Sequence, residues 1–90
     1  MQISANHRKV LIIGASSEIG TKLCERYLTK EHSVIGHFAH HPKLLEPLAK
    51  EYSQLSLLQT DLTDLDAVAD VAKRHSSVDV VIFLASMMQP

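Results

Sequence analysis

The stretch VLIIGASSEIG, residues Val10–Gly20, decides the fold class of this 90-residue chain. Four apolar residues lead directly into Gly14, and an amphipathic helical pattern follows. A buried strand, a tight turn at a glycine and an immediate helix form the βα unit in which free helix N–H groups bind phosphate. The stretch therefore predicts a nucleotide-binding loop, composed of Gly14, Ser16, Ser17, Glu18, Ile19 and Gly20. The alternative is a plain βα turn without a ligand.

Four short apolar segments punctuate the chain, and each is partly β-branched. They are Val10–Ile13, Val34–Phe38, Leu55–Leu58 and Val78–Leu84. Continuous apolar runs of this length are typical of strands buried on both faces, as in a parallel sheet.

Three helical patterns separate the strands. The first places Ile19, Leu23, Cys24, Tyr27 and Leu28 on one face. The second spans 44–52, but Pro47 lies inside it, so that helix is expected to start late or to kink. The third covers 65–72, with Thr63 as its cap.

The alternation predicts an α/β fold, a Rossmann-type parallel sheet with strand order 3-2-1-4 and flanking helices. The first two helices should cover one face and the third helix the other. Residues 1–90 are expected to form one NAD(P)-binding domain portion, incomplete after the fourth strand. The strand at 78–84 would be a bare apolar edge that pairs with missing sequence or with a second copy, as a homo-oligomer.

Composition excludes several classes of function. The 46% hydrophobic and 21% charged fractions are typical of a globular protein, and the net charge of −1 offers no basic surface for nucleic acid or membrane. No apolar run is long enough for a bilayer. The single cysteine, Cys24, cannot form an internal disulfide, which favours a cytoplasmic location. Its side chain is expected in the core.

Two further motifs follow the third and fourth strands. Asp61 lies just past the third strand, at the sheet edge where ligands bind, and its carboxylate can accept a hydrogen bond from an adenine amino group. Ala85 and Ser86 are small residues that leave room for a flat ligand beside the fourth strand. The alternatives are helix capping near Asp61 and an ordinary apolar strand end near Ala85.

Together the motifs GASSEIG, DLT and VDVVIFLAS resemble the short-chain dehydrogenase/reductase family, over Lys9 to about Met87. The resemblance implies that the glycine loop holds the pyrophosphate of a nicotinamide dinucleotide. It implies that Asp61 and the backbone amide of Leu62 contact adenine, and that Ala85 and Ser86 lie beside the cofactor ribose. It covers only the cofactor-binding half of the family's domain.

The branch of the family stays open. The single-domain branch usually has glycine where Glu18 stands and Asn-Asn-Ala-Gly where this chain has Phe83–Ser86. The extended, sugar-nucleotide branch often ends that strand in His-Leu-Ala-Ala, which is closer, but its middle glycine would fall at Ser17. We expect Glu18 to point to solvent and to weaken phosphate binding without abolishing it.

The end of the second strand favours NADP over NAD as the cofactor. NAD-preferring members place an acidic residue there, whereas Gly36–His41 contains none. His40 or His41 can donate a hydrogen bond to a 2′-phosphate, helped by Ser16 or Ser17. A second interpretation makes His37, His40 and His41 a solvated loop, and no metal site is predicted because their spacing supplies no fixed ligand geometry.

No catalytic residue is predicted. The family's chemistry needs a Ser and a Tyr-x-x-x-Lys pair, but Tyr27 is followed by Glu31 and Tyr52 by Ser56 at the lysine spacing. Both tyrosines are expected to pack in the core. The sequence therefore predicts the cofactor-binding portion of an oxidoreductase; the alternative is a non-catalytic nucleotide-binding or dimerisation module.

Overall fold

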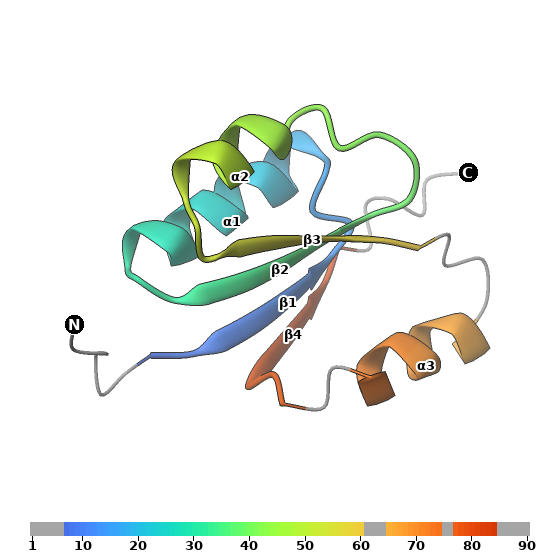
Figure 1. The fold of residues 1–90 in the computed structure, drawn as a ribbon. Coiled ribbons are helices and arrows are strands. Elements are labelled where there is room, and N and C mark those ends of the chain that lie inside the picture. The colour runs from blue at the N-terminus through green and yellow to red at the C-terminus, as the bar shows by residue number, and fades with distance from the viewer. Residues whose placement is uncertain (1–6, 61–64, 75–76, 85–90) are drawn as a thin grey trace.

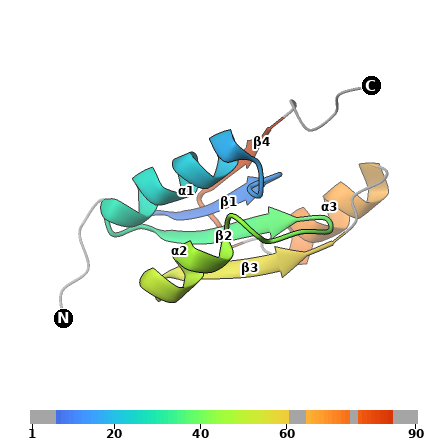
Figure 2. The ribbon, with the colours of Figure 1, turned by 90° about the horizontal axis from the view of Figure 1, so that it is seen from above.

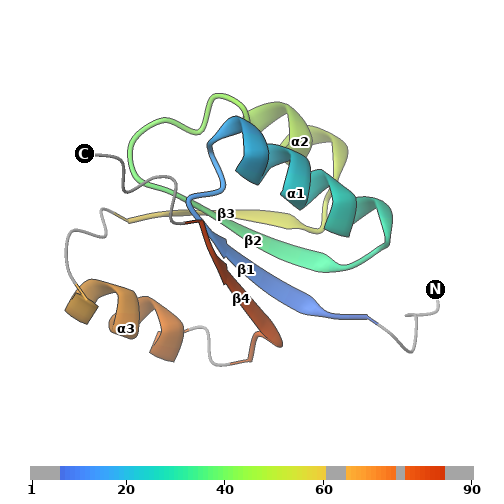
Figure 3. The same cartoon turned by 180° about the vertical axis from the view of Figure 1, so that it is seen from behind.

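A four-stranded parallel sheet carries helices on both faces in the computed structural model, which describes residues 7–60, 65–74 and 77–84 (Figure 1). The strands are β1 (Lys9–Ile13), β2 (Ser33–Phe38), β3 (Leu55–Gln59) and β4 (Val80–Phe83). The helices are α1 (Glu18–Thr29), α2 (Glu46–Glu51) and α3 (Leu65–Arg74). Helices α1 and α2 lie on one face of the sheet and α3 lies on the other, as predicted (Figures 1 and 3).

The strand order is β3-β2-β1-β4, which confirms the predicted order. Strand β1 is central, because Val10 pairs in parallel with Val34 of β2 and with Val80 of β4. The carboxyl ends of all four strands therefore meet at one edge of the sheet, where the loops that follow β1 and β2 lie side by side (Figure 2).

Helix α2 is shorter than its apolar pattern. It begins at Glu46 and has Pro47 in its first turn, where proline costs no hydrogen bond. The preceding residues form a turn in which the amides of Leu45 and Glu46 donate to the carbonyl of Pro42. The late start that Pro47 predicts is confirmed.

Each face of the sheet has its own core. On the α1/α2 face, strand residues such as Val10, Ile12 and Val34 pack with Cys24 and Leu28 of α1. On the α3 face, the buried residues of the smaller core are Leu11, Ile13 and Val71. Tyr27 and Tyr52 are partly buried against the first core, as expected.

Strand β4 is the edge that the sequence predicts, but it is not buried on both faces. Val80 and Ile82 pack against the α1/α2 core, whereas Val81 is 52% exposed and Phe83 is 45% exposed on the other face. The reason is that Val71 of α3 packs against β1 and leaves this part of β4 uncovered.

Two further sequence expectations need correction. Ile19 is 66% exposed and does not join the core stripe of α1, because it lies in the first turn of the helix, ahead of the buried Cys24. His40 and His41 are exposed, but His37 is not part of a solvated loop. Its side chain is fully buried within β2, and both of its ring nitrogens have hydrogen-bond partners.

Among the described helices, none has the length and apolar character needed to cross a membrane.

Candidate functional site

The candidate site begins where β1 ends. Gly14 has a φ of 83°, in the left-handed region that glycine adopts without strain, and it turns the chain from the strand into the loop. The amide of the next residue, Ala15, donates to the carbonyl of His37 at 2.8 Å. The loop therefore leaves β1 while it stays attached to the neighbouring strand β2.

Ser17 caps helix α1. Its hydroxyl accepts a hydrogen bond from the amide of Gly20 at 3.0 Å and donates to the carbonyl of Gly14 at 3.3 Å. The first-turn amides of Glu18 and Ile19 have no partner within the helix, since the first N–H groups of a helix lack an intrahelical acceptor. These amides give the loop its capacity for an anion.

Gly20 brings α1 onto the turn. A Cβ atom at this position would lie 2.7 Å from the Cα of Ala15 and 2.7 Å from the carbonyl oxygen of Gly14. Both are backbone atoms that cannot move aside without displacing the loop. The hydroxyl of Thr21 adds a hydrogen bond to the carbonyl of Ala15 at 3.1 Å. The helix and the loop are therefore one closely packed unit.

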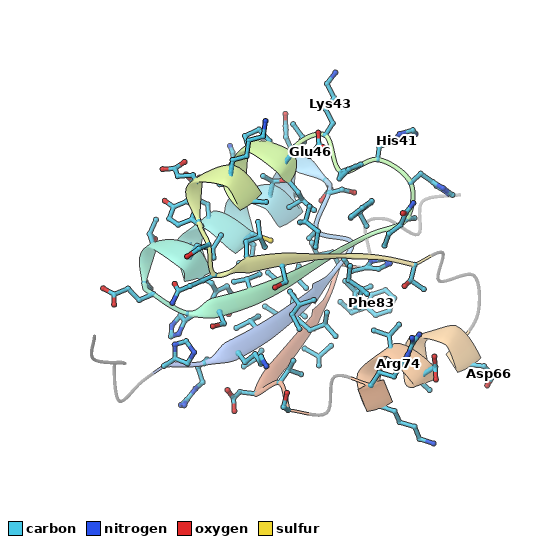
Figure 4. The ribbon with its side chains drawn as sticks, viewed as in Figure 1. His41, Lys43, Glu46, Asp66, Arg74 and Phe83 are labelled. Atoms are coloured by element: carbon cyan, nitrogen blue, oxygen red, sulfur yellow. The ribbon has the colours of Figure 1, made fainter. Side chains whose placement is uncertain are left out.

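The loop and the segment after β2 line an open pocket of about 310 Å³. Its lining residues are Gly14, Ser16, Ser17, Ala39, His40 and His41. Figure 4 shows His41 on the segment that follows β2, on the α1/α2 side of the sheet. Four predicted residues from two separate stretches of the chain thus meet at one pocket: Gly14, Ser16 and Ser17 of the loop, and His40 of the segment after β2. Neither histidine ring is buried, and the two ring centroids are 6.2 Å apart.

The remaining predicted residues have different outcomes. Glu18 and Ile19 are exposed beside the loop, and Gly20 is buried beneath it. Asp61, Leu62, Ala85 and Ser86 lie outside the described residues, so their predicted contacts stay predictions.

His37 is the site residue that the sequence analysis missed. Its Nδ1 accepts a hydrogen bond from the amide of Gly14 at 3.1 Å, and its Nε2 lies 2.6 Å from the carbonyl oxygen of Thr60. Its position inside an apolar strand could have indicated this role, because a buried histidine needs hydrogen-bond partners for both ring nitrogens.

Two other features bear on the chemistry. A second cavity, of about 290 Å³, lies at the other end of α1 and is lined by residues such as Arg26 and Lys30. None of the predicted site residues lines it. Within the described ranges, no three His, Cys, Asp or Glu side chains are grouped to hold a metal ion.

Comparison with known proteins gives a consistent result. Residues 10–89 match the model of the NAD dependent epimerase/dehydratase family. The chain is 30% identical over 80 residues to the cyclic-di-GMP-binding biofilm dispersal mediator protein of Escherichia coli (strain K12), across 89% of this chain and 33% of that protein. The chain thus spans about a third of the length of this curated relative.

Solved structures share the fold. A short-chain dehydrogenase from Streptomyces avermitilis is 32% identical, with a TM-score of 0.68 over 88% of this chain and 30% of its own. BdcA from E. coli is 31% identical, with a TM-score of 0.72 over 82% of this chain and 39% of its own.

Proposed function

Because this chain belongs to the NAD dependent epimerase/dehydratase family, we propose that residues 1–90 bind a nicotinamide dinucleotide and form the cofactor-binding portion of a short-chain dehydrogenase/reductase-type oxidoreductase. The observation that carries the proposal is the pocket between the glycine loop and His40. A plain βα turn has no need of such a pocket at the carboxyl ends of the strands, which is where ligands bind in open α/β sheets.

The residues of the loop fit a pyrophosphate. Gly14 and Gly20 have no side chain that would fill the space of the turn, and the amides of Glu18 and Ile19 are free to donate. The hydroxyl of Ser16 is free to join them, whereas the hydroxyl of Ser17 is already used to cap α1. Ile19 offers an exposed apolar surface at the start of the helix. When bound, the dinucleotide would supply hydride transfer.

The pocket favours NADP. Its wall after β2 carries His40 and His41 and no carboxylate. A 2′-phosphate therefore meets hydrogen-bond donors and no like charge, while a ribose diol lacks the acidic partner typical of NAD sites. NAD is the second choice. The resemblance adds Asp61 and Leu62 at the adenine, and Ala85 and Ser86 at the ribose.

The 90 residues contain no Tyr-x-x-x-Lys pair, so we assign them binding and no proton transfer. A cytoplasmic location stays a prediction from the single cysteine.

A second candidate function is a non-catalytic nucleotide-binding or dimerisation module. Its specific support is the exposure of Val81 and Phe83 on the edge strand β4, which a second copy could cover as a homo-oligomer. The E. coli relative that is named for binding cyclic-di-GMP makes this nucleotide the natural competitor to test.

Calorimetric titration with NADP, NAD and cyclic-di-GMP tests both candidates. We expect NADP to bind several-fold more tightly than NAD, and His40→Asp to reverse that preference because the carboxylate repels the 2′-phosphate and accepts from the ribose diol. Ser53→Asp is the matched control, since it adds the same charge at an exposed turn before β3, at the opposite end of the sheet.

Each other outcome has a defined meaning. Absence of NADP and NAD binding at millimolar concentration would reject the cofactor site. Binding of cyclic-di-GMP alone would favour the second candidate, and sedimentation would then show whether the chain dimerises. Hydride transfer by the pure 90-residue chain would contradict the assignment of binding without catalysis.

A further inference from the structure

The side chain of His37 is fully buried, and it is the one buried polar or charged side chain among the described residues. It lies in β2 between the ends of two other strands. Its Nδ1 is 3.1 Å from the amide nitrogen of Gly14, after β1, and its Nε2 is 2.6 Å from the carbonyl oxygen of Thr60, after β3. One imidazole therefore connects the glycine loop to the end of β3.

The hydrogen bonds fix the protonation of the ring. The amide of Gly14 is a donor, so Nδ1 must present a lone pair. The carbonyl of Thr60 is an acceptor, so Nε2 must carry the proton. Only the neutral imidazole with its proton on Nε2 satisfies both partners.

His37 also begins a continuous series of hydrogen bonds that reaches helix α1. The ring accepts from Gly14, the carbonyl of Gly14 accepts from the hydroxyl of Ser17, and that hydroxyl accepts from the amide of Gly20. The main chain reinforces the first step, since Ala15 donates to the carbonyl of His37 at 2.8 Å. The conformation of the loop and the position of the helix N-terminus thus depend on the same ring.

We infer that His37 is a positioning residue of the dinucleotide site: its neutral, Nε2-protonated imidazole holds Gly14 so that the loop amides are oriented for the pyrophosphate. The inference rests on the proposed function for its ligand. It adds a link between the two parts of that site, because Asp61, the residue expected at the adenine, directly follows Thr60 in the sequence. His37 touches no ligand in this role and acts through the backbone.

Two substitutions separate the hydrogen bonds. In His37→Asn the amide oxygen can take the place of Nδ1 and keep the bond to Gly14, while the bond to Thr60 is lost. In His37→Gln the terminal amide can reach Thr60 in place of Nε2, while Gly14 loses its acceptor. We expect His37→Asn to keep NADP affinity within about threefold of wild type, and His37→Gln to weaken it by about tenfold or more.

His32→Gln is the matched control. The Nδ1 of His32 also accepts a backbone amide, that of Arg8 at 2.9 Å, but at the opposite end of the strands. We expect this variant to lose the same kind of bond and to bind NADP as wild type does. Equal NADP affinity of the Asn and Gln variants at position 37 would overturn the positioning role.

Two measurements on the free wild-type protein test the inference. They require neither a cofactor nor a variant that might fail to fold. Nitrogen-15 NMR of the His37 ring should show the proton on Nε2, and the amide of Gly14 should be protected from hydrogen exchange. A proton on Nδ1, or a rapidly exchanging Gly14 amide, would overturn the inference. If wild type binds no dinucleotide while both signals are as expected, the proposed cofactor fails and the role of His37 in holding the loop stands.

Discussion

A Cβ atom on Gly20 would lie 2.7 Å from the Cα of Ala15, so helix α1 and the glycine loop are in contact through their backbones. We expect Gly20→Ala to lower the free energy of unfolding by about 1–3 kcal/mol and to abolish NADP binding, because either the helix or the loop must shift. Gly36→Ala is the control, since a Cβ there would meet its nearest atoms at 3.5 Å, an ordinary contact. Urea unfolding and calorimetry of both variants check this. Equal stability of the two variants would contradict the close approach.

The two serines of the loop should separate stability from binding. Ser17→Ala removes the cap of α1 and should lower the free energy of unfolding by about 1 kcal/mol. Ser16→Ala should leave stability within about 0.5 kcal/mol and weaken NADP binding, because its hydroxyl lines the pocket and caps no helix. Thermal unfolding and titration of each variant distinguish the effects. The prediction fails if Ser16→Ala is the more destabilised.

Glu18 is exposed in the first turn of α1, beside the proposed phosphate position. Its charge opposes a pyrophosphate, although the helix N-terminus favours it when no ligand is bound. We expect Glu18→Gly to raise NADP affinity. The same increase with Glu18→Gln would assign the effect to the charge and not to loop flexibility. NADP affinities that match wild type in both variants would remove Glu18 from the site.

Glu31 occupies a position that suits glycine. Its φ is 67°, and it ends α1 in a motif where its amide donates to the carbonyl of Leu28 and the amide of His32 donates to that of Tyr27. For a residue that carries a Cβ atom, the left-handed backbone conformation is less favourable than the right-handed one by about 1–2 kcal/mol. Glu31→Gly should therefore raise the free energy of unfolding by about 1 kcal/mol. Lys30→Gly is the control: with a φ of −95°, Lys30 should show no such gain.

Burial raises the pKa of the Cys24 thiol to about 12. The thiol of the unfolded chain ionises near pH 8.5, so between about pH 8.5 and 12 only the unfolded state gains this charge. The stabilisation that the neutral, buried Cys24 thiol provides is therefore fully present below about pH 8.5, and it is lost as the pH rises from there toward 12. The stability difference between wild type and Cys24→Ala should shrink between pH 8 and 11. Native protein should resist alkylation at pH 8 until urea is added.

The fold was predictable because its signals are local. Each apolar segment gives a strand, and the connection lengths give parallel pairing in the observed order. Pro47 marked the late start of α2. The family was predictable from the residues that follow the strands, and the match of residues 10–89 confirms it.

The corrections come from packing that periodicity does not specify. Ile19 fits the helical stripe, but it lies in the first turn, ahead of the part of α1 that packs on the sheet. His37 is polar in an apolar strand, and its role depends on Gly14 and Thr60, each 23 residues away in the sequence. Only a fold that brings these three positions together reveals why the ring is tolerated there.

The position of β4 has a consequence for the order of folding. Its pairing with β1 joins Val10 to Val80, whereas the pairing of β1 with β2 joins Val10 to Val34. Closing the longer segment costs about 1 kcal/mol more in chain entropy. We therefore expect the unit β1-α1-β2, with the glycine loop inside it, to assemble first, and the apolar fourth strand to join last and to detach first. On this order, the glycine loop forms in the earliest part of the chain to fold.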